Sequence, residues 1–230
     1  MTYSEVIFDR YLRQLGYKPR IDYYSNFKIN GNPPIDFYIN KSNPKILVQI
    51  KEFNPYAKKS KRRRQLKEEK MYDGYDAEDL RNKIDEIGNQ FEPYKDSTDY
   101  ICIGVIQDHP MFIAFRKDNI AEAMYGDQGV RVTQRYPKIE YHLVFNRNGA
   151  MSKRKNTRIS AICSLTSAAD NTHILEDGNV IKCICVLNHF SKKRVQHSFF
   201  SGSRDEIWGI NKDSGSLEKL SPPPTRAVQF

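Results

Sequence analysis

The sequence has few of the residues and motifs on which several classes of protein depend. Its 230 residues include four cysteines and a single tryptophan, and four cysteines are too few for a disulfide-stabilised fold of this length. No apolar run approaches the roughly 20 residues that a membrane-spanning helix needs. The first residues carry neither the positive nor the apolar region of a secretory signal. We therefore expect a cytoplasmic protein without a membrane partner.

Several catalytic motifs are missing as well. The five histidines are scattered without the spacing of a zinc protease, and the sequence has no glycine-rich phosphate loop and no serine nucleophile elbow. Cys183 and Cys185 would share one face of a strand, but Cys102 and Cys163 add no CxxC-type spacing. Buried thiols are therefore expected at these positions rather than a zinc site.

Basic residues are in excess and are clustered. Lysine and arginine number 37 against 28 acidic residues, a net charge of +9. The first cluster is centred on residues 58–64, within a segment (51–70) that carries a net charge of +6. The second is formed by Lys153, Arg154, Lys155 and Arg158, and the third occupies residues 192–194. Such clusters can bind a polyphosphate by neutralising its charge and releasing counterions, although solvated loops are the alternative interpretation. The residues expected to contact nucleic acid are Lys58, Lys59, Lys61, Arg62, Arg63, Arg64, Lys153, Arg154 and Lys155.

The spacing of apolar residues predicts a mixed α/β fold. Helices are expected over residues 4–15, 76–94 and 119–125, and strands over residues 21–29, 35–39, 45–53, 100–107, 111–116, 139–145, 158–165, 180–187 and 196–200. No repeat and no clear linker interrupts the chain. We expect a single domain over residues 1–230, with a core over about 1–116 and a β-rich extension over about 130–210.

The most informative pattern lies in the hairpin predicted over residues 35–53. Because residues two apart share a face of a strand, Gln49 and Lys51 lie on one face, and Asp36 lies opposite them if the strands pair in register. Asp36, the side-chain oxygen of Gln49 and the backbone carbonyl of Ile50 can hold Mg²⁺ together with water. Lys51 would then act on the attacking water or stabilise the negative transition state.

This pattern resembles the motif of the PD-(D/E)XK nucleases, the restriction-endonuclease-like superfamily. The resemblance is carried by Pro34-Ile35-Asp36 and, after a turn, Gln49-Ile50-Lys51. The predicted order of elements over residues 1–116 also matches the αβββαβ core of that family. The resemblance implies such a core with a mixed central sheet, extended by further C-terminal strands. It implies catalytic roles for Glu5, Asp36, Gln49, Lys51 and Gln90, and metal ligands at Glu5, Asp36, Gln49 and Ile50.

The sequence departs from the family pattern at two positions. Gln49 stands where the family usually has Asp or Glu, and Ile35 stands where an acidic residue often precedes the first ligand. An amide oxygen binds Mg²⁺ less strongly because the site loses a full charge. Glu52 is not a substitute for Gln49, because strand alternation places it on the face away from Lys51 unless the strand carries a bulge.

The sequence therefore favours a metal-dependent nuclease that hydrolyses phosphodiester bonds. The expected substrate is DNA, and the expected cofactor is Mg²⁺ with Mn²⁺ as a substitute. The alternative is a catalytically inactive protein with a nuclease fold that binds nucleic acid, in which Gln49 reflects lost metal affinity. A third hypothesis is a basic scaffold for acidic protein partners. A homodimer is left open.

Overall fold

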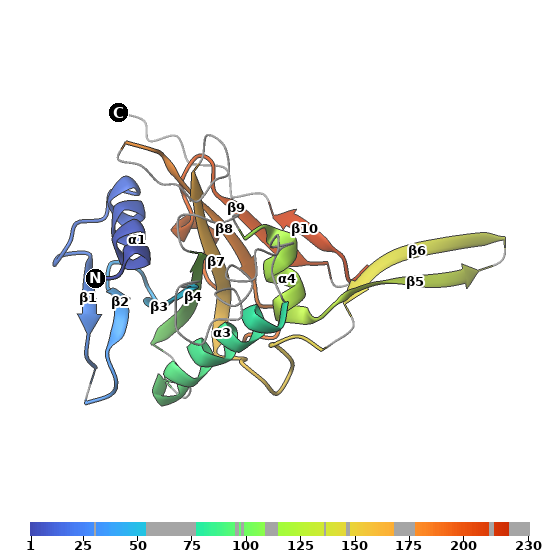
Figure 1. Cartoon of the computed structure of the whole chain (residues 1–230), viewed down its shortest axis with the longest axis horizontal. Helices are drawn as coiled ribbons and strands as arrows, with labels where there is room; N and C mark the ends of the chain where they lie inside the picture. The colour runs from blue at the N-terminus through green and yellow to red at the C-terminus, as the bar shows by residue number, and fades with distance from the viewer. Residues whose placement is uncertain are drawn as a thin grey trace, which may run out of the picture.

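The computed structural model describes residues 1–29, 31–53, 77–94, 97, 99–108, 115–135, 137–145, 148–167, 178–211 and 214–220. These residues form three layers around a central sheet (Figure 1). Helix α1 (Tyr3–Gln14) covers one face, and helices α3 (Ala77–Gln90) and α4 (Lys117–Tyr125) cover the other. None of the helices in these ranges is both long enough and apolar enough to cross a membrane.

Within the described ranges, the central sheet has eight strands. Strands β1, β2 and β3 are antiparallel neighbours, β3, β4 and β7 run parallel, β8 returns antiparallel to β7, β9 runs parallel to β8, and β10 is antiparallel to β9. The sheet is therefore mixed, as predicted. In order across the sheet the strands are β1 (Tyr23–Phe27), β2 (Ile35–Ile39), β3 (Lys45–Phe53), β4 (Tyr100–Asp108), β7 (Ile159–Ser167), β8 (Ile181–Leu187), β9 (Glu206–Ile210) and β10 (Leu217–Leu220).

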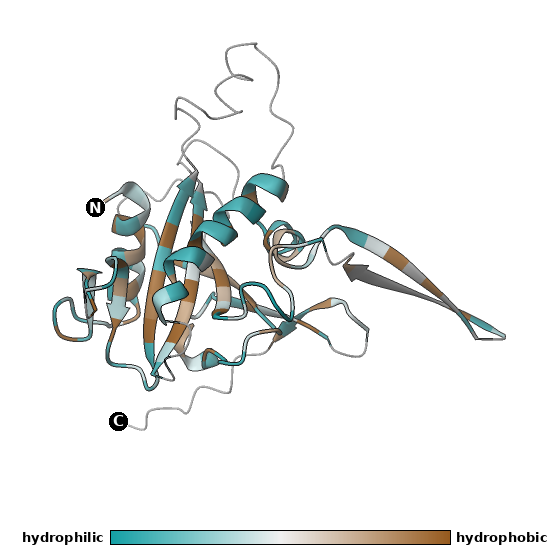
Figure 2. Ribbon diagram, turned by 90° about the horizontal axis from the view of Figure 1, so that it is seen from below, coloured by the Kyte–Doolittle hydropathy of each residue, from teal (hydrophilic) through white to brown (hydrophobic). Residues whose placement is uncertain are grey.

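Strands β5 (Gln128–Arg135) and β6 (Lys138–Phe145) form a separate two-stranded ribbon. The ribbon projects from the body of the molecule beyond α4 (Figures 1 and 2). Two short 3-10 helices, Glu92–Tyr94 and His197–Phe199, complete the regular structure of the described residues.

Strand β3 lies at the centre of the fold because both of its faces are buried. Ile46, Val48 and Ile50 belong to the apolar cluster that includes α1, whereas Leu47 belongs to the cluster that includes α3 and α4. A parallel strand covered on both faces reads as a nearly continuous apolar run, and β3 pairs with β4 along its whole length. The end of β3 is therefore held from both sides of the sheet.

Most of the predicted elements are confirmed, with the order helix, three strands, helix and strand over the first half of the chain. The predicted strand over residues 196–200 is wrong. Phe199 and Phe200 are both buried in the cluster that includes α1, and successive residues of a strand point to opposite faces, so a 3-10 turn replaces the strand. Strands β5, β9 and β10 were not predicted. Residues 111–114 of the predicted strand over 111–116 lie outside the described residues.

Helix α1 is tied to the C-terminal half of the sheet by a buried hydrogen bond. The hydroxyl of Tyr11, which is fully buried, donates to Oδ2 of Asp205 at 2.6 Å. Asp205 also accepts hydrogen bonds from the backbone N–H groups of Cys183, at 2.8 Å, and Gly202, at 3.0 Å. Burial raises the pKa of Asp205, so the carboxylate depends on these donors.

We expect Tyr11→Phe to lower the free energy of unfolding by about 1 to 3 kcal/mol, because a buried acceptor loses one donor. Urea denaturation measures this change. The matched control is Tyr24→Phe in β1, where the ring is partly exposed and packs on Phe27; we expect a change below about 0.5 kcal/mol. Equal effects of the two substitutions would contradict the assigned role of Tyr11.

Candidate metal centre at the end of strand β3

The register between β2 and β3 brings the predicted ligands together. Phe37 pairs with Val48, so Asp36 lies one step further along, beside Gln49. Oδ2 of Asp36 accepts a hydrogen bond from Nε2 of Gln49 and another, at 2.6 Å, from the backbone N–H of Ile50. The carboxylate, the amide and the backbone that the sequence predicted to converge are therefore in contact.

The carboxyl group of Asp36 lies in an environment that disfavours its negative charge. Burial raises its pKa to about 6, and the negative charge of Glu5 raises it as well. The hydrogen bond from Ile50, the charge of Lys51 and the hydrogen bond from Gln49 act in the opposite direction and do not offset the burial. A cation at this position would supply the missing compensation.

Gln49 supplies an unsatisfied oxygen to the same place. Its side chain is 3% exposed, and its Oε1 is buried without a hydrogen-bond partner among the described residues. Turning the amide over would direct Oε1 at the carboxylate of Asp36, an arrangement that needs a cation or a proton between the two oxygens. A carboxylate oxygen, an amide oxygen and a backbone carbonyl are the hard donors that Mg²⁺ prefers. The residues present therefore fit such an ion.

The proposed ligand set depends on neutral oxygens. Among the described residues, no group of three or more His, Cys, Asp or Glu side chains is arranged to hold a metal ion. Asp36 would therefore be joined by Gln49 and the carbonyl of Ile50, and water would complete the coordination. This composition implies weaker binding than a site with several carboxylates.

Glu5 caps the start of helix α1, and its negative charge also acts on Asp36. Its Oε2 accepts a hydrogen bond from the backbone N–H of Thr2 at 2.8 Å, and its own N–H donates to the hydroxyl of Thr2, which is a capping box at the start of α1. Its charge still acts on Asp36. A metal-binding role for Glu5 stays a prediction.

Glu52 lies on the opposite face, as strand alternation requires. Its Oε2 accepts hydrogen bonds from the hydroxyl of Ser4 at 2.6 Å and from the backbone N–H of Ser4 at 3.1 Å. Both donors belong to the first turn of α1, where a carboxylate is favoured by the helix dipole. Glu52 therefore anchors α1 and does not replace Gln49 as a ligand.

Lys51 lies on the same face of β3 as Gln49 and meets helix α3. Its Nζ lies 3.9 Å from Oε2 of Glu86, and both carboxylate oxygens of Glu86 lie 3.0 Å from Nζ of Lys83. Glu86 was not among the residues predicted for the site. The helical spacing of Lys83, Glu86 and Gln90 is a signal that these residues share one face of α3, although it does not say what that face meets.

Gln90 lies one turn beyond Glu86 in α3. Its Oε1 is buried without a hydrogen-bond partner among the described residues. The supporting role that the family resemblance implies for Gln90 stays a prediction.

The structure describes the second and third basic clusters but not the first. The residues of the first cluster, 58–64, lie outside the described residues. Lys153 and Arg154 are exposed, whereas Lys155 forms an ion pair of 2.8 Å with Asp85 of α3. In the third cluster, Lys193 donates to the backbone carbonyls of Ser97 and Tyr100. The ammonium group of Lys193 therefore holds the start of β4.

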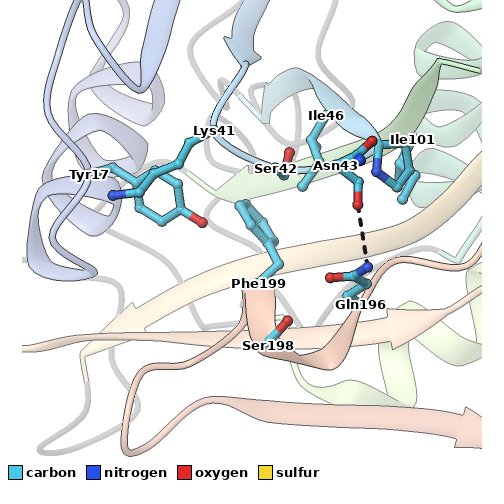
Figure 3. A pocket seen from close by; sticks show the side chains of 10 residues that line it. Tyr17, Lys41, Ser42, Asn43, Ile46, Ile101, Gln196, Ser198 and Phe199 are labelled. Atoms are coloured by element: carbon cyan, nitrogen blue, oxygen red, sulfur yellow. Dashed lines mark hydrogen bonds between the residues drawn. The ribbon is translucent and has the colours of Figure 1, made fainter. Parts of the chain in front are cut away.

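A cavity of about 410 Å³ opens at the other end of β3 (Figure 3). Tyr17, Lys41, Ile46, Gln196 and Phe199 are among the residues that line it. Lys41 is already neutralised, because its Nζ lies 3.3 Å from Oδ2 of Asp22. Ile46 precedes Lys51 by five residues, or roughly 17 Å of strand. The cavity is therefore separate from the candidate metal centre.

The four cysteines are free and buried, as expected. Burial raises the pKa of each thiol, so the thiolate form that binds metals or attacks substrates is disfavoured.

Comparison with known proteins gives no match: no family model fits the chain, and neither a curated protein nor a solved structure matches it. The interpretation of the site therefore depends on its own geometry and chemistry.

We expect Asp36→Asn to stabilise the protein at neutral pH in the absence of metal. The folded-state pKa of about 6 lies above the unfolded value. The favourable contribution of Asp36 is therefore present below about pH 4 and is lost as the pH rises through about 6. The uncharged Asn avoids that loss and should gain about 1 to 3 kcal/mol near pH 8, because one pKa unit corresponds to about 1.4 kcal/mol and Asp36 keeps some contact with solvent.

Urea denaturation in a buffer with EDTA measures this gain. We expect the difference between the two proteins to shrink as the pH falls to about 4. A destabilisation by Asp36→Asn of the same size at both pH values would show that Asp36 has a purely structural role.

Proposed function

We propose that the protein is a Mg²⁺-dependent nuclease that hydrolyses phosphodiester bonds of DNA, with Mn²⁺ as a substitute metal. The observation that carries this proposal is the cluster at the end of β3, where Asp36 contacts Gln49 and the backbone of Ile50 and where Lys51 shares the face of Gln49. The resemblance of this motif to that of the PD-(D/E)XK nucleases supports the same reading.

The roles of the residues follow from their chemistry. Asp36, the oxygen of Gln49 and the carbonyl of Ile50 would hold the metal, which when bound polarises the phosphate and activates water. Lys51 can donate hydrogen bonds to the attacking water or to the phosphate oxygens that gain charge in the transition state. Its 3.9 Å separation from Glu86 is too long for a hydrogen bond, so Lys51 remains able to turn toward substrate.

The charge of the protein suits a nucleic acid. The chain carries a net charge of +9, and Lys153 and Arg154 are exposed beside α3, which contributes Glu86 to the site. Contacts of this kind neutralise phosphates and position the backbone, but they carry no sequence information.

A second candidate function is binding of nucleic acid without catalysis. One observation favours it: Gln49 presents its N–H group, and not its oxygen, to Asp36. This hydrogen bond compensates part of the buried charge of Asp36 without a metal. The two functions differ in what Mg²⁺ does to the protein, and the substitutions below separate them.

We expect Lys51→Ala to reduce Mg²⁺-dependent cleavage of plasmid DNA by about 100-fold or more, because transition-state stabilisation is lost, while DNA affinity changes by no more than a few-fold. The matched control is Lys45→Ala, which removes the same charge from the same face of β3 at its other end. Full cleavage by Lys51→Ala would contradict the role of Lys51.

We expect Gln49→Glu to bind Mg²⁺ more tightly, because the site gains a negative charge in place of a neutral oxygen. The concentration of Mg²⁺ that gives half of the maximal increase in melting temperature should fall, and so should the concentration for half-maximal cleavage. Gln49→Leu removes the oxygen at similar volume and should abolish both effects. If neither the wild type nor Gln49→Glu responds to Mg²⁺, the nuclease proposal is contradicted and only the second candidate function remains.

A further inference from the structure

The cavity at the start of strand β3 lies between three segments that are distant in the sequence (Figure 3). Residues 41–44, which connect β2 with β3, form one wall. Tyr17, just after α1, and the 3-10 turn His197–Phe199 form the others. Its volume of about 410 Å³ lies within the range of small-molecule sites. The cavity therefore suits a small ligand better than a macromolecule.

The floor of the cavity is apolar and belongs to the core. Ile46 of β3, Ile101 of β4 and Phe199 are each at most 5% exposed and lie in the apolar cluster that includes α1. The rings of Tyr17 and Phe199 meet edge to face, with their centroids 6.2 Å apart and their planes at 67°. Because core packing fixes these side chains, the cavity is preformed. Aromatic and aliphatic walls of this kind favour a ligand with a flat apolar body.

The charge inside the cavity is balanced. Within the part of the chain that the structure describes, Lys41 is the only charged side chain among the lining residues. Its Nζ lies 3.3 Å from Oδ2 of Asp22 and 5.3 Å from the centre of the Tyr17 ring. An anionic ligand would have to compete with Asp22 for this ammonium group. Electrostatic complementarity therefore favours a ligand without charge.

Neutral hydrogen-bonding groups stand at the rim of the cavity. Asn43, Gln196 and Ser198 line it and are exposed, so a ligand can reach them. Nε2 of Gln196 donates to the backbone carbonyl of Asn43 across the cavity at 3.4 Å (Figure 3), which is longer than an ordinary hydrogen bond. A ligand can replace this contact at little cost. A primary amide presents a donor beside an acceptor, and this pair matches the amino group and N7 of adenine.

We propose that the cavity binds an uncharged nucleoside with an adenine-type base. The base would pack on the apolar floor against the ring of Phe199 or Tyr17, because every base has a face that stacks on aromatic side chains. The amides of Asn43 and Gln196 would bind the edge of the base. The site is separate from the candidate metal centre, and the inference does not rest on the proposed function.

Isothermal titration calorimetry of the full-length protein with adenosine, in a buffer with EDTA, tests this inference. We expect one site with a Kd on the order of 0.1 mM, the affinity that is ordinary for a ligand of this size. Inosine, which has an oxygen in place of the amino group, should bind several-fold more weakly, because the amide then faces two acceptors. Benzyl alcohol, a ring without such an edge, should bind about tenfold more weakly or not at all.

Two substitutions at the rim locate the binding site. Ser198→Trp fills the cavity and should weaken adenosine binding by about tenfold or more. Gln196→Ala removes the amide from an exposed position and should weaken binding by about fivefold, the effect of one hydrogen bond. The matched control Ser25→Trp adds the same bulk at an exposed serine of β1 that does not line the cavity, and it should leave binding unchanged. Lys41→Gln should change the affinity by no more than about twofold, because exposed ion pairs contribute little.

The outcomes separate this cavity from the metal centre. The inference is overturned if adenosine shows no saturable binding up to about 5 mM, if both rim variants bind it like the wild type, or if benzyl alcohol binds equally well. It is also overturned if adenosine 5′-phosphate binds about tenfold more tightly than adenosine and Lys41→Gln removes that gain, because the ligand is then an anion. Adenosine binding that persists in Asp36→Asn, with no cleavage of DNA by the wild type in Mg²⁺ or Mn²⁺, supports the cavity and contradicts the nuclease proposal.

Discussion

The burial of strand β3 on both of its faces is the constraint that places the candidate site. Alternate residues of the strand pack toward α1 on one side and α3 on the other. The side chains at its C-terminal end therefore face two helices that are distant in sequence. At that end, Glu52 binds Ser4 of α1 and Lys51 approaches Glu86 of α3. The polar residues thus begin where the apolar run of the strand ends, and each helix meets one of them.

The polar cluster beside that end is costly for the folded state. Burial raises the pKa of Asp36, and Gln49 buries an oxygen that no described residue satisfies. Groups that break the ordinary rules of burial are expected at functional sites, where the requirements of stability are relaxed in favour of binding. Asp205 is half-buried as well, and burial also raises its pKa. It accepts three hydrogen bonds and connects α1 with the C-terminal strands, whereas Asp36 accepts two, from residues of β3.

Helix α3 connects the candidate site with the rest of its face of the sheet. Glu86 faces Lys51, Arg81 pairs with Asp127 at the base of the β5–β6 ribbon, and Asp85 binds Lys155 and Asn156. A Cβ at Gly88 would collide with the side-chain amide of Asn156, so the close approach of Asn156 to the helix favours glycine at this position.

The sequence alone determined the features that depend on local periodicity. The period of two in a strand predicted that Gln49 and Lys51 share a face and that Glu52 faces away, and the apolar spacing predicted the helices and the strands of the first half. The pairing register that sets Asp36 beside Gln49 was decided by the folded sheet. Contacts between distant segments were decided by tertiary structure. Glu86 meets Lys51 across 35 positions of the chain, Lys193 is occupied by carbonyls of residues 97 and 100, and residues 197–199 turn because two adjacent phenylalanines enter one core. Local patterns record which face a residue occupies, whereas the identity of the partner on that face depends on how the whole chain packs.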